Sequence, residues 1–253
     1  MTASNNKKIK ISKQVQYINN KLKTFSACTI SDKIQARKIN QISTPIVKDI
    51  LDNKFDNGSD MDAVVCLFDN LFLATAKSRK DGLFHLSVHV SKWLKKLTQI
   101  DTSGSVGFVY FSDILSDIEV IIKTPRYAED YDYMVREYFI GVTEINKLRH
   151  IIPTFLYTFG AFICPISPEG KLCSPSPKTP KIPFVIFEKI PGDNMQKMLA
   201  SDKITFEEYL GMFIQILLSL EVAQRDISFC HFDFHTDNLM CRTISKECKY
   251  TVP

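Results

Sequence analysis

The stretch that decides the fold is His231-Phe232-Asp233-Phe234-His235-Thr236-Asp237-Asn238, which has the pattern H-x-D-x-x-x-x-N. An aspartate in such a loop can orient a hydroxyl group and accept its proton, and an asparagine five residues later can bind a metal ion. Taken alone, the pattern is also compatible with a polar turn after a helix. Its meaning therefore depends on which residues precede it, and in what order.

The composition is that of an ordinary globular protein. The chain has 253 residues, of which 45% are hydrophobic and 24% charged, and this is enough apolar material for a core. The net charge of +4 is too small to indicate a nucleic-acid partner. No apolar run approaches the roughly 18 residues that a membrane span needs. We therefore expect neither a nucleic-acid partner nor insertion into a membrane.

The seven cysteines are widely spaced, and no two of them form a C-x-x-C pair. An odd count at wide spacing argues against a disulfide framework and against a zinc site. We expect most of these cysteines to be small buried side chains in a reducing compartment.

The pattern of the chain changes twice. Residues 1–95 carry no chemical motif and are predicted to form a mostly helical extension, with a half-buried strand where Leu86, Val88 and Val90 alternate with polar residues. Residues 96–188 are rich in strand-forming runs, at 108–111, 120–122, 155–159 and 184–187, with a helix at about 129–149. The prolines between 165 and 183 predict a long surface loop.

Residues from about 205 onward predict a long helix that leads directly to the His231–Asn238 loop. Thr205-Phe206-Glu207-Glu208 has the T-x-x-E pattern of a capping box. The apolar residues that follow at helical spacing, such as Leu210, Phe213 and Leu217, should face a core.

The first possible partner of the loop is the glycine-containing stretch Thr102–Val109. It fits the later part of G-x-G-x-x-G-x-V, with Thr102 in place of the first glycine. Gly104 and Gly107 would allow a backbone hairpin to approach phosphate groups closely. A two-glycine turn between strands is the alternative.

The second partner is Lys123, at the end of the apolar run Val120-Ile121-Ile122, which matches V-A-I-K with one bulkier residue. In a nucleotide cleft this lysine would meet the α- and β-phosphates. Otherwise it would extend to solvent from the end of a strand. Its acidic partner should lie on the following helix. We favour Glu137, because its neighbours are apolar, and Glu144 on the same helical face is the alternative.

The third partner is the apolar strand 184–187, which enters a short polar crossover ending in Pro191-Gly192. The backbone of Glu188 and Ile190 could supply an acceptor and a donor to the edge of an adenine base. A strand followed by an ordinary turn is the alternative.

Over residues 95–253 the order of these features resembles the protein-kinase-like superfamily. The resemblance implies an α+β, bilobal fold with a complete β-rich N-lobe at 96–188, and a hinge with an incomplete helical C-lobe at 189–253. It implies ATP and Mg²⁺ as cofactors. The residues that it implicates are Gly104, Gly107, Val109, Lys123, Glu137, Glu188 and Ile190 for the nucleotide, Asp233 as base, Asn238 for the metal, and His231 as a brace of the loop.

His235 stands where many protein kinases have a lysine that contacts the transferred phosphate, and we include it among the catalytic residues. H-x-D-x-H-x-x-N is similar to loops of the aminoglycoside- and choline-kinase type. The stretch from Glu137 to Phe155 also resembles protein kinases encoded by large DNA viruses. The phosphate acceptor, a protein or a small molecule, therefore stays open. The expected location is cytoplasmic, or the host cytoplasm or virion for a viral protein.

No D-F-G sequence follows Asn238, so the second metal-binding carboxylate of this superfamily is not found there. We expect a truncated or split ATP-dependent phosphotransferase with low or no activity on its own, and a 205–223 helix with an exposed apolar stripe. The alternative is a catalytically inactive, pseudokinase-like module that binds a nucleotide or a protein.

Overall fold

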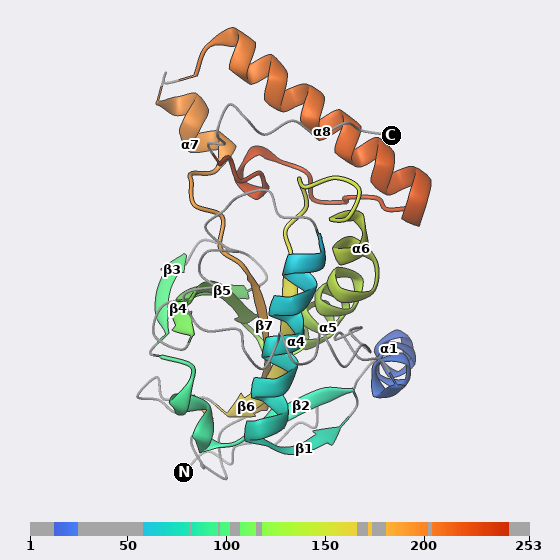
Figure 1. The fold of residues 1–253 in the computed structure, drawn as a ribbon, viewed down its shortest axis with the longest axis vertical. Helices are drawn as coiled ribbons and strands as arrows, with labels where there is room; N and C mark the ends of the chain where they lie inside the picture. The colour runs from blue at the N-terminus through green and yellow to red at the C-terminus, as the bar shows by residue number, and fades with distance from the viewer. Residues whose placement is uncertain are drawn as a thin grey trace, which may run out of the picture.

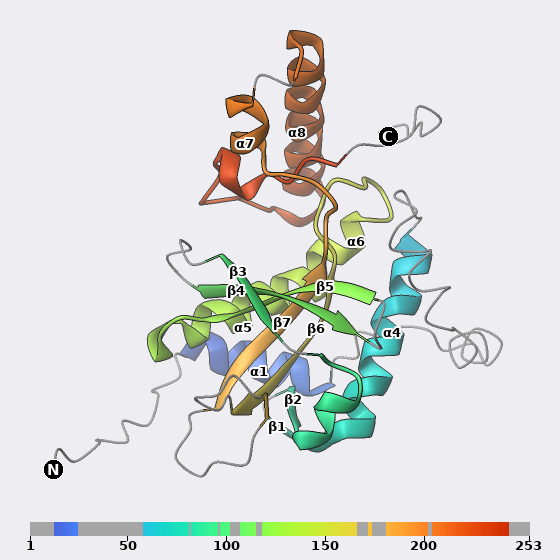
Figure 2. The ribbon, with the colours of Figure 1, turned by 90° about the vertical axis from the view of Figure 1, so that its left-hand side faces the viewer.

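The structure, a computed structural model, is α+β and contains a seven-stranded mixed sheet with helices on both faces (Figures 1 and 2). It describes residues 13–24, 58–80, 82–95, 97–101, 107–114, 118–165, 172–173, 181–201 and 204–242. The strand order is β1-β2-β6-β7-β5-β4-β3. All neighbouring strands are antiparallel except β2 and β6, which are parallel.

The bounds of the elements are as follows. The strands are β1 Ala76–Lys80, β2 Leu83–Leu86, β3 Thr98–Asp101, β4 Gly107–Ile114, β5 Ile118–Pro125, β6 Thr158–Pro165 and β7 Lys181–Glu188. The α-helices are α1 Lys13–Thr24, α4 Gly58–Thr75, α5 Tyr131–Ile140, α6 Asn146–Leu148, α7 Met195–Ala200 and α8 Phe206–Ile227. Short helical turns are η1 Val88–Lys92, η2 Ala128–Asp130, η3 Gly141–Ile145 and η4 Thr236–Asn238.

The sheet separates two apolar clusters because successive residues of a strand face opposite sides. On β5, Val120 and Ile122 join the cluster that contains Phe68 and Phe72 of α4. Ile121, between them, packs against the opposite cluster, which contains residues of α1 and α5. Figure 2 shows α4 on one side of the sheet and α1 with α5 on the other. Helices therefore cover both faces of the sheet, and burial decides the register of its strands.

The helix that carries Glu137 is held in place where the helical residues after it, Gly141 and Asn146, contact the start of β6. After α5 the helix continues through the π-helical turn η3 into α6. A Cβ atom on Gly141 would lie 2.2 Å from the hydroxyl oxygen of Thr158, so only glycine fits this contact. Asn146 then accepts a hydrogen bond from Thr158 N–H at 2.9 Å and donates one to the Thr158 carbonyl at 2.8 Å. These contacts set the position of α5 above the sheet.

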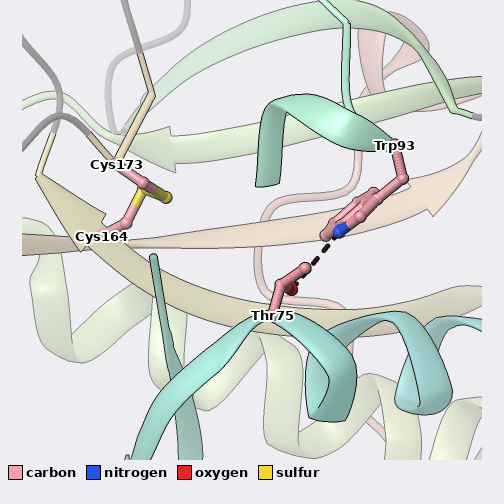
Figure 3. Close-up of a disulfide and its surroundings, with 4 residues drawn as sticks. All are labelled: Thr75, Trp93, Cys164 and Cys173. Carbon is pink, nitrogen blue, oxygen red and sulfur yellow. Dashed lines mark hydrogen bonds between the residues drawn. A yellow bond between two sulfur atoms is a disulfide. The ribbon is translucent and has the colours of Figure 1, made fainter. Parts of the chain in front are cut away.

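The region predicted as an extension is part of the same sheet. Its residues 58–86 supply α4, β1 and β2, and Phe84 of β2 pairs with Phe162 of β6. The alternating residues at 86–90 are not one strand: β2 ends at Leu86, and Val88–Lys92 forms the 3-10 turn η1. That turn buries Val90 and places Trp93, whose indole N–H donates to the Thr75 hydroxyl at 3.3 Å (Figure 3). The strand predicted at 155–159 begins only at Thr158.

The expectation of cysteines without disulfides was wrong. Cys164, on β6, and Cys173 form a disulfide whose Cα atoms are 4.7 Å apart (Figure 3). Both side chains are buried in the cluster beneath α4. Cys66 is disulfide-bonded as well, whereas Cys230 and Cys241 are free. Spacing along the chain could not reveal the Cys164–Cys173 pair, because it depends on the connection after β6 returning to the core. The proline-dense part of this connection lies outside the described residues.

Residues 189–242, here called the C-terminal segment, lie at one end of the sheet (Figure 1). The predicted capping box is present: Glu208 N–H donates to the Thr205 hydroxyl at 3.2 Å, and Thr205 N–H donates to the Glu208 carboxylate at 2.8 Å. Near its C-terminal end, α8 buries Val222 and Ala223 against Leu148. Leu210, Phe213, Ile214 and Leu217 are 43–50% exposed, so the expectation that they face a core was wrong. The exposed apolar stripe that was also expected for this helix is present.

Within the described part of the chain, we find no helix with the length and apolar character required to cross a membrane.

Candidate functional site

Lys123 and Glu137 form an ion pair between the sheet and α5. The Lys123 ammonium lies 2.8 and 3.0 Å from the two carboxylate oxygens of Glu137. The side chains are 30% and 35% exposed, so the pair is only partly shielded from solvent. Glu144, the alternative partner, instead pairs with Lys147 at 3.2 Å on the helix surface.

Strand β4, which begins at Gly107 and is called the glycine strand here, pairs with the strand that carries Lys123. Val109 pairs with Lys123, and Gly107 pairs with Pro125. A Cβ atom on Gly107 would lie 2.6 Å from the Thr124 carbonyl oxygen and 3.7 Å from the Cε atom of Lys123. Glycine is therefore required at position 107 by the close approach of the two strands, whether or not a ligand binds. Gly104 lies outside the described residues.

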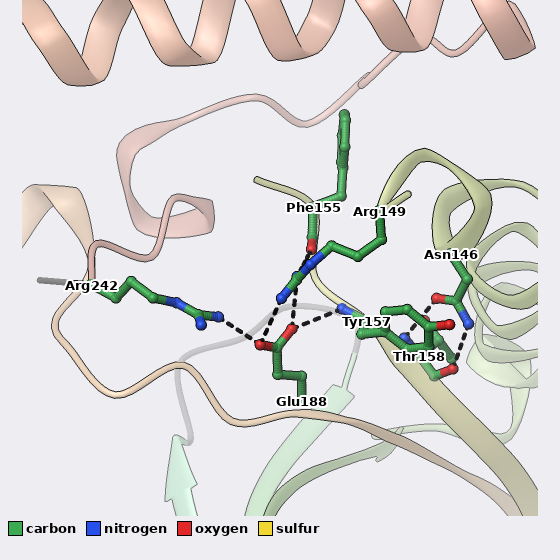
Figure 4. A network of polar contacts seen from close by, with 7 residues as sticks. All are labelled: Asn146, Arg149, Phe155, Tyr157, Thr158, Glu188 and Arg242. Atoms are coloured by element: carbon green, nitrogen blue, oxygen red, sulfur yellow. Dashed lines mark hydrogen bonds and ion pairs between the residues drawn. The ribbon is translucent and has the colours of Figure 1, made fainter. Parts of the chain in front are cut away.

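Glu188, at the end of β7, is buried, and its side chain is the centre of a polar network (Figure 4). The carboxylate accepts two hydrogen bonds from Arg149, at 2.9 and 3.1 Å. It accepts a third from Arg242 at 2.6 Å and a weaker one from Tyr157 N–H at 3.3 Å. Burial raises the pKa of Glu188, but the charges and hydrogen bonds of Arg149 and Arg242 outweigh it and hold this pKa below its ordinary value. Ile190, the other predicted hinge residue, is partly buried.

His231 lies within a group of aromatic rings at the start of the loop. Its imidazole is edge-on to Phe229, with ring centroids 5.9 Å apart, and to Phe234 at 5.5 Å. Its Nδ1 atom is buried and has no hydrogen-bond partner among the described residues. Ring packing is therefore the contact through which His231 can brace the loop.

Asp233, His235 and Asn238 come together at the tip of the loop. The Asn238 amide nitrogen donates to the Asp233 carbonyl at 2.9 Å and to its carboxylate at 3.2 Å, and it lies 3.0 Å from His235 Nε2. His235 has a carboxylate on each side, with Asp233 at 3.6 Å and Asp237 at 3.8 Å. The Asp233 side chain is 83% exposed, so a substrate could reach it from solvent.

Residues at the start of α7 also hold the loop, through hydrogen bonds to Asp237 and Leu239. Asn194 caps α7 by accepting a hydrogen bond from Lys197 N–H at 2.9 Å, and it donates to the Asp237 carboxylate at 3.0 Å. Two backbone hydrogen bonds, Met195 N–H to Leu239 at 2.8 Å and Cys241 N–H to Asp193 at 2.9 Å, join the segments before and after the loop.

The side-chain oxygen atoms of the loop could supply only some of the ligands that a cation such as Mg²⁺ needs. Asp233 and Asn238 offer two adjacent oxygen-bearing side chains. Among the described residues there is no group of three or more His, Cys, Asp or Glu side chains that could hold a metal ion. Mg²⁺ commonly takes one or two protein ligands and completes its shell with phosphate oxygens and water. The two residues therefore fit Mg²⁺ that arrives with a nucleotide.

The sequence reasoning missed the role of the Glu188 side chain and both of its arginine partners. Glu188 directly follows the apolar run Phe184–Phe187, which is a local signal that its charge is buried and paired. Arg149, which has Lys147 and His150 close by, had no such signal. Arg242 had none either. It is 54 residues from Glu188 in sequence, and the fold alone brings the two together.

Comparison with known proteins gives one informative relative. No family model matches the chain. The chain is 26% identical over 150 residues to "Probable kinase 098L" of Invertebrate iridescent virus 3, an alignment that covers 59% of this chain and 26% of that protein. The matched region thus spans about a quarter of the relative's length. This similarity supports a distant kinase-like relationship.

Proposed function

We propose that this chain is a kinase-like phosphotransferase module that uses ATP and Mg²⁺. The observation that carries the proposal is the Lys123–Glu137 pair, in which an acid on α5 holds a strand lysine beside the glycine strand β4. In this proposal the fold is bilobal, with the sheet as one lobe and the C-terminal segment as the hinge and part of the other. Lys123 binds nucleotide phosphates, and Gly107 and Val109 of β4, together with Gly104 earlier in the sequence, cover them.

In this proposal the remaining residues have the following roles. The Glu188 carbonyl and the Ile190 N–H contact the adenine edge. Asp233 orients the acceptor hydroxyl and takes its proton, while Asn238 holds the Asp233 carboxylate and contributes to the metal site. His235 lies beside both and faces the transferred phosphate. Mg²⁺, when bound, would neutralise charge on the nucleotide phosphates.

Nucleotide binding is tested with a matched pair of lysine variants. Lys123→Met removes the lysine of the candidate site, whereas Lys147→Met removes a surface lysine that also pairs with a glutamate on the same helical region. A charged hydrogen bond contributes about 1.5–3 kcal/mol, so Lys123→Met should weaken ATP·Mg²⁺ binding by about 10- to 150-fold. Isothermal titration and ATP-dependent thermal shift measure this. Equal affinities for the two variants would contradict the proposal.

Phosphoryl transfer is tested with Asp233→Asn, which keeps the shape of the side chain but removes the base. Turnover should fall by about 10²–10⁴-fold while ATP affinity is retained. The assay follows transfer from γ-labelled ATP to generic protein acceptors, to choline and to an aminoglycoside, because His235 leaves the acceptor class open. Equal background rates for the native and Asp233→Asn proteins would exclude catalysis by this chain.

A second candidate function is a non-catalytic, pseudokinase-like module that binds a nucleotide or a protein. It is favoured by the lack, among the described residues, of any group of three or more His, Cys, Asp or Glu side chains that could hold a metal ion. This function predicts ATP binding that is independent of Mg²⁺ and is not followed by turnover.

A further inference from the structure

Three segments that are distant in sequence meet at the Glu188 carboxylate. Glu188 ends β7, Arg149 directly follows α6, and Arg242 lies four residues beyond Asn238. We call Glu188, Arg149 and Arg242 the Glu188 triad. Figure 4 shows the two guanidinium groups approaching the carboxylate from different elements.

The two arginines do not hold Glu188 in the same way. Arg149 forms a bidentate pair with Glu188 and also donates to the Phe155 carbonyl, so this pair is complete within the sheet and its adjoining helix. Arg242 comes from the C-terminal segment and adds one further bond, to Glu188 Oε1 at 2.6 Å. It is 13% exposed, while Glu188 and Arg149 are almost fully buried. Arg242 thus joins the C-terminal segment to a carboxylate that Arg149 already holds.

The Arg242–Glu188 bond links the residues just after the loop to the sheet. The preceding residues Leu239 and Cys241 are already hydrogen-bonded to Met195 and Asp193, next to the isolated bridge between Asn194 and Met240. A Cβ atom on Gly192 would lie 1.8 Å from the Cys241 carbonyl oxygen, so the backbone before the loop and the backbone after it are in direct contact. Arg242 extends this contact from the C-terminal segment into the sheet.

A continuous path of paired strands leads from Glu188 to Lys123. Both Glu188 and Val185 lie on β7, and in the register of β7 with β5 they face Val120 and Lys123. The Arg242–Glu188 bond therefore connects the end of the loop to the strand that carries Lys123.

We propose that Arg242 is a positioning residue, whose ion pair with Glu188 holds the His231–Asn238 loop in a fixed relation to Lys123 and Glu137. Without it the backbone hydrogen bonds that join the end of the loop to residues 193–195 open more often, and the loop loses its alignment with the sheet. The consequence for phosphate transfer rests on the proposed function, whereas the mechanical consequence does not.

Native-state hydrogen exchange on the full chain tests the mechanical part. In Arg242→Met, the amides of Met195 and Cys241, which join the residues before the loop to those after it, should exchange at least about tenfold faster, with β5 and β7 unchanged. Arg225→Met is the matched control, because it removes an arginine whose ion pair with Asp226 is on the surface of α8. Arg242→Lys keeps the charge and should restore part of the protection. It also provides the comparison should Arg242→Met not fold.

Two results would overturn the proposal. Exchange that rises equally in the sheet and in the C-terminal segment would show that the triad contributes only to global stability. Exchange at native rates in Arg242→Met would show that the ion pair does not hold the loop. A second measurement concerns the catalytic consequence: Arg242→Met should lower kcat more than it raises the KM for ATP, with partial rescue by Arg242→Lys. Failure of the native chain to bind ATP would end the proposed function but leave the exchange result valid.

Discussion

The two long apolar helices of this molecule have opposite surroundings. Phe68 and Phe72 of α4 are buried between the helix and the sheet. Phe213 and Leu217 of α8, which are equally apolar, are 43% and 50% exposed. The difference teaches that an apolar helix face is buried only where a second layer is present to cover it. Within the described residues, α4 packs on the sheet along most of its length, whereas the buried residues of α8, Ser219, Val222 and Ala223, lie in its C-terminal half.

The largest expected effect comes from comparing a phenylalanine of the buried sheet, on β6, with one on the exposed face of α8. Phe162 is fully buried, and its ring stacks on Phe184 with centroids 5.1 Å apart. Phe162→Ala should lower the free energy of unfolding by about 3–5 kcal/mol, the cost of a large cavity. Phe213→Ala on α8 should change it by less than about 0.5 kcal/mol, because the ring is exposed. Urea denaturation measures both. Similar losses would mean that the α8 face is covered in solution.

Two asparagines provide the next test. Asn146→Ala removes both hydrogen bonds to the Thr158 backbone and leaves buried polar groups unpaired, which should cost about 2 kcal/mol or more. Asn194→Ala removes the exposed cap of α7 and the exposed hydrogen bond to Asp237, and should cost about 1 kcal/mol. The same denaturation series measures them. A larger loss for Asn194→Ala would place the main stabilising contacts of the chain in the C-terminal segment.

The third test uses pH at the boundary between the two regions. The pKa of Glu188 is lowered in the folded state, so its ionised form adds stability above the ordinary pKa of about 4.3. This stability is lost as pH falls through the lower, folded-state pKa, at about 1.4 kcal/mol per unit of lowering. Glu188→Gln should therefore be less stable at pH 7 and flatter below pH 5, as measured by denaturation midpoints. Glu207→Gln, an exposed acid on α8, is the control, and a flat native profile would contradict the expectation.

The smallest expected effect distinguishes two thiols within the C-terminal segment. Cys230 is exposed, whereas burial raises the pKa of the Cys241 thiol, which lies 3.6 Å from the sulfur of Met212 on α8. Because the thiolate is the reactive form, iodoacetamide should modify Cys230 first at pH 7.5. Peptide mapping by mass spectrometry measures the two rates. Equal rates would show that α8 leaves the Cys241 side chain uncovered.

The sequence predicted features that depend on local pattern. The apolar run before Lys123, the helix with Glu137 and the capping box at Thr205 are all present in the structure. The exposed stripe of α8 was also expected. Features that depend on long-range contact were missed: the parallel pairing of β2 with β6, the Cys164–Cys173 disulfide and the Glu188–Arg242 bond. In each, neither residue alone indicates its partner, because the partner is selected by the packed sheet.

The parallel pairing of β2 with β6 also has a consequence during synthesis on the ribosome. Phe84 emerges roughly 80 residues before its partner Phe162, an interval of about 4–16 s at ordinary rates of translation. During that time the β1–β2 hairpin and the apolar side of α4 have no sheet to join. Long sequence separation between contacts slows folding. This part of the nascent chain is therefore where we expect chaperones to bind first.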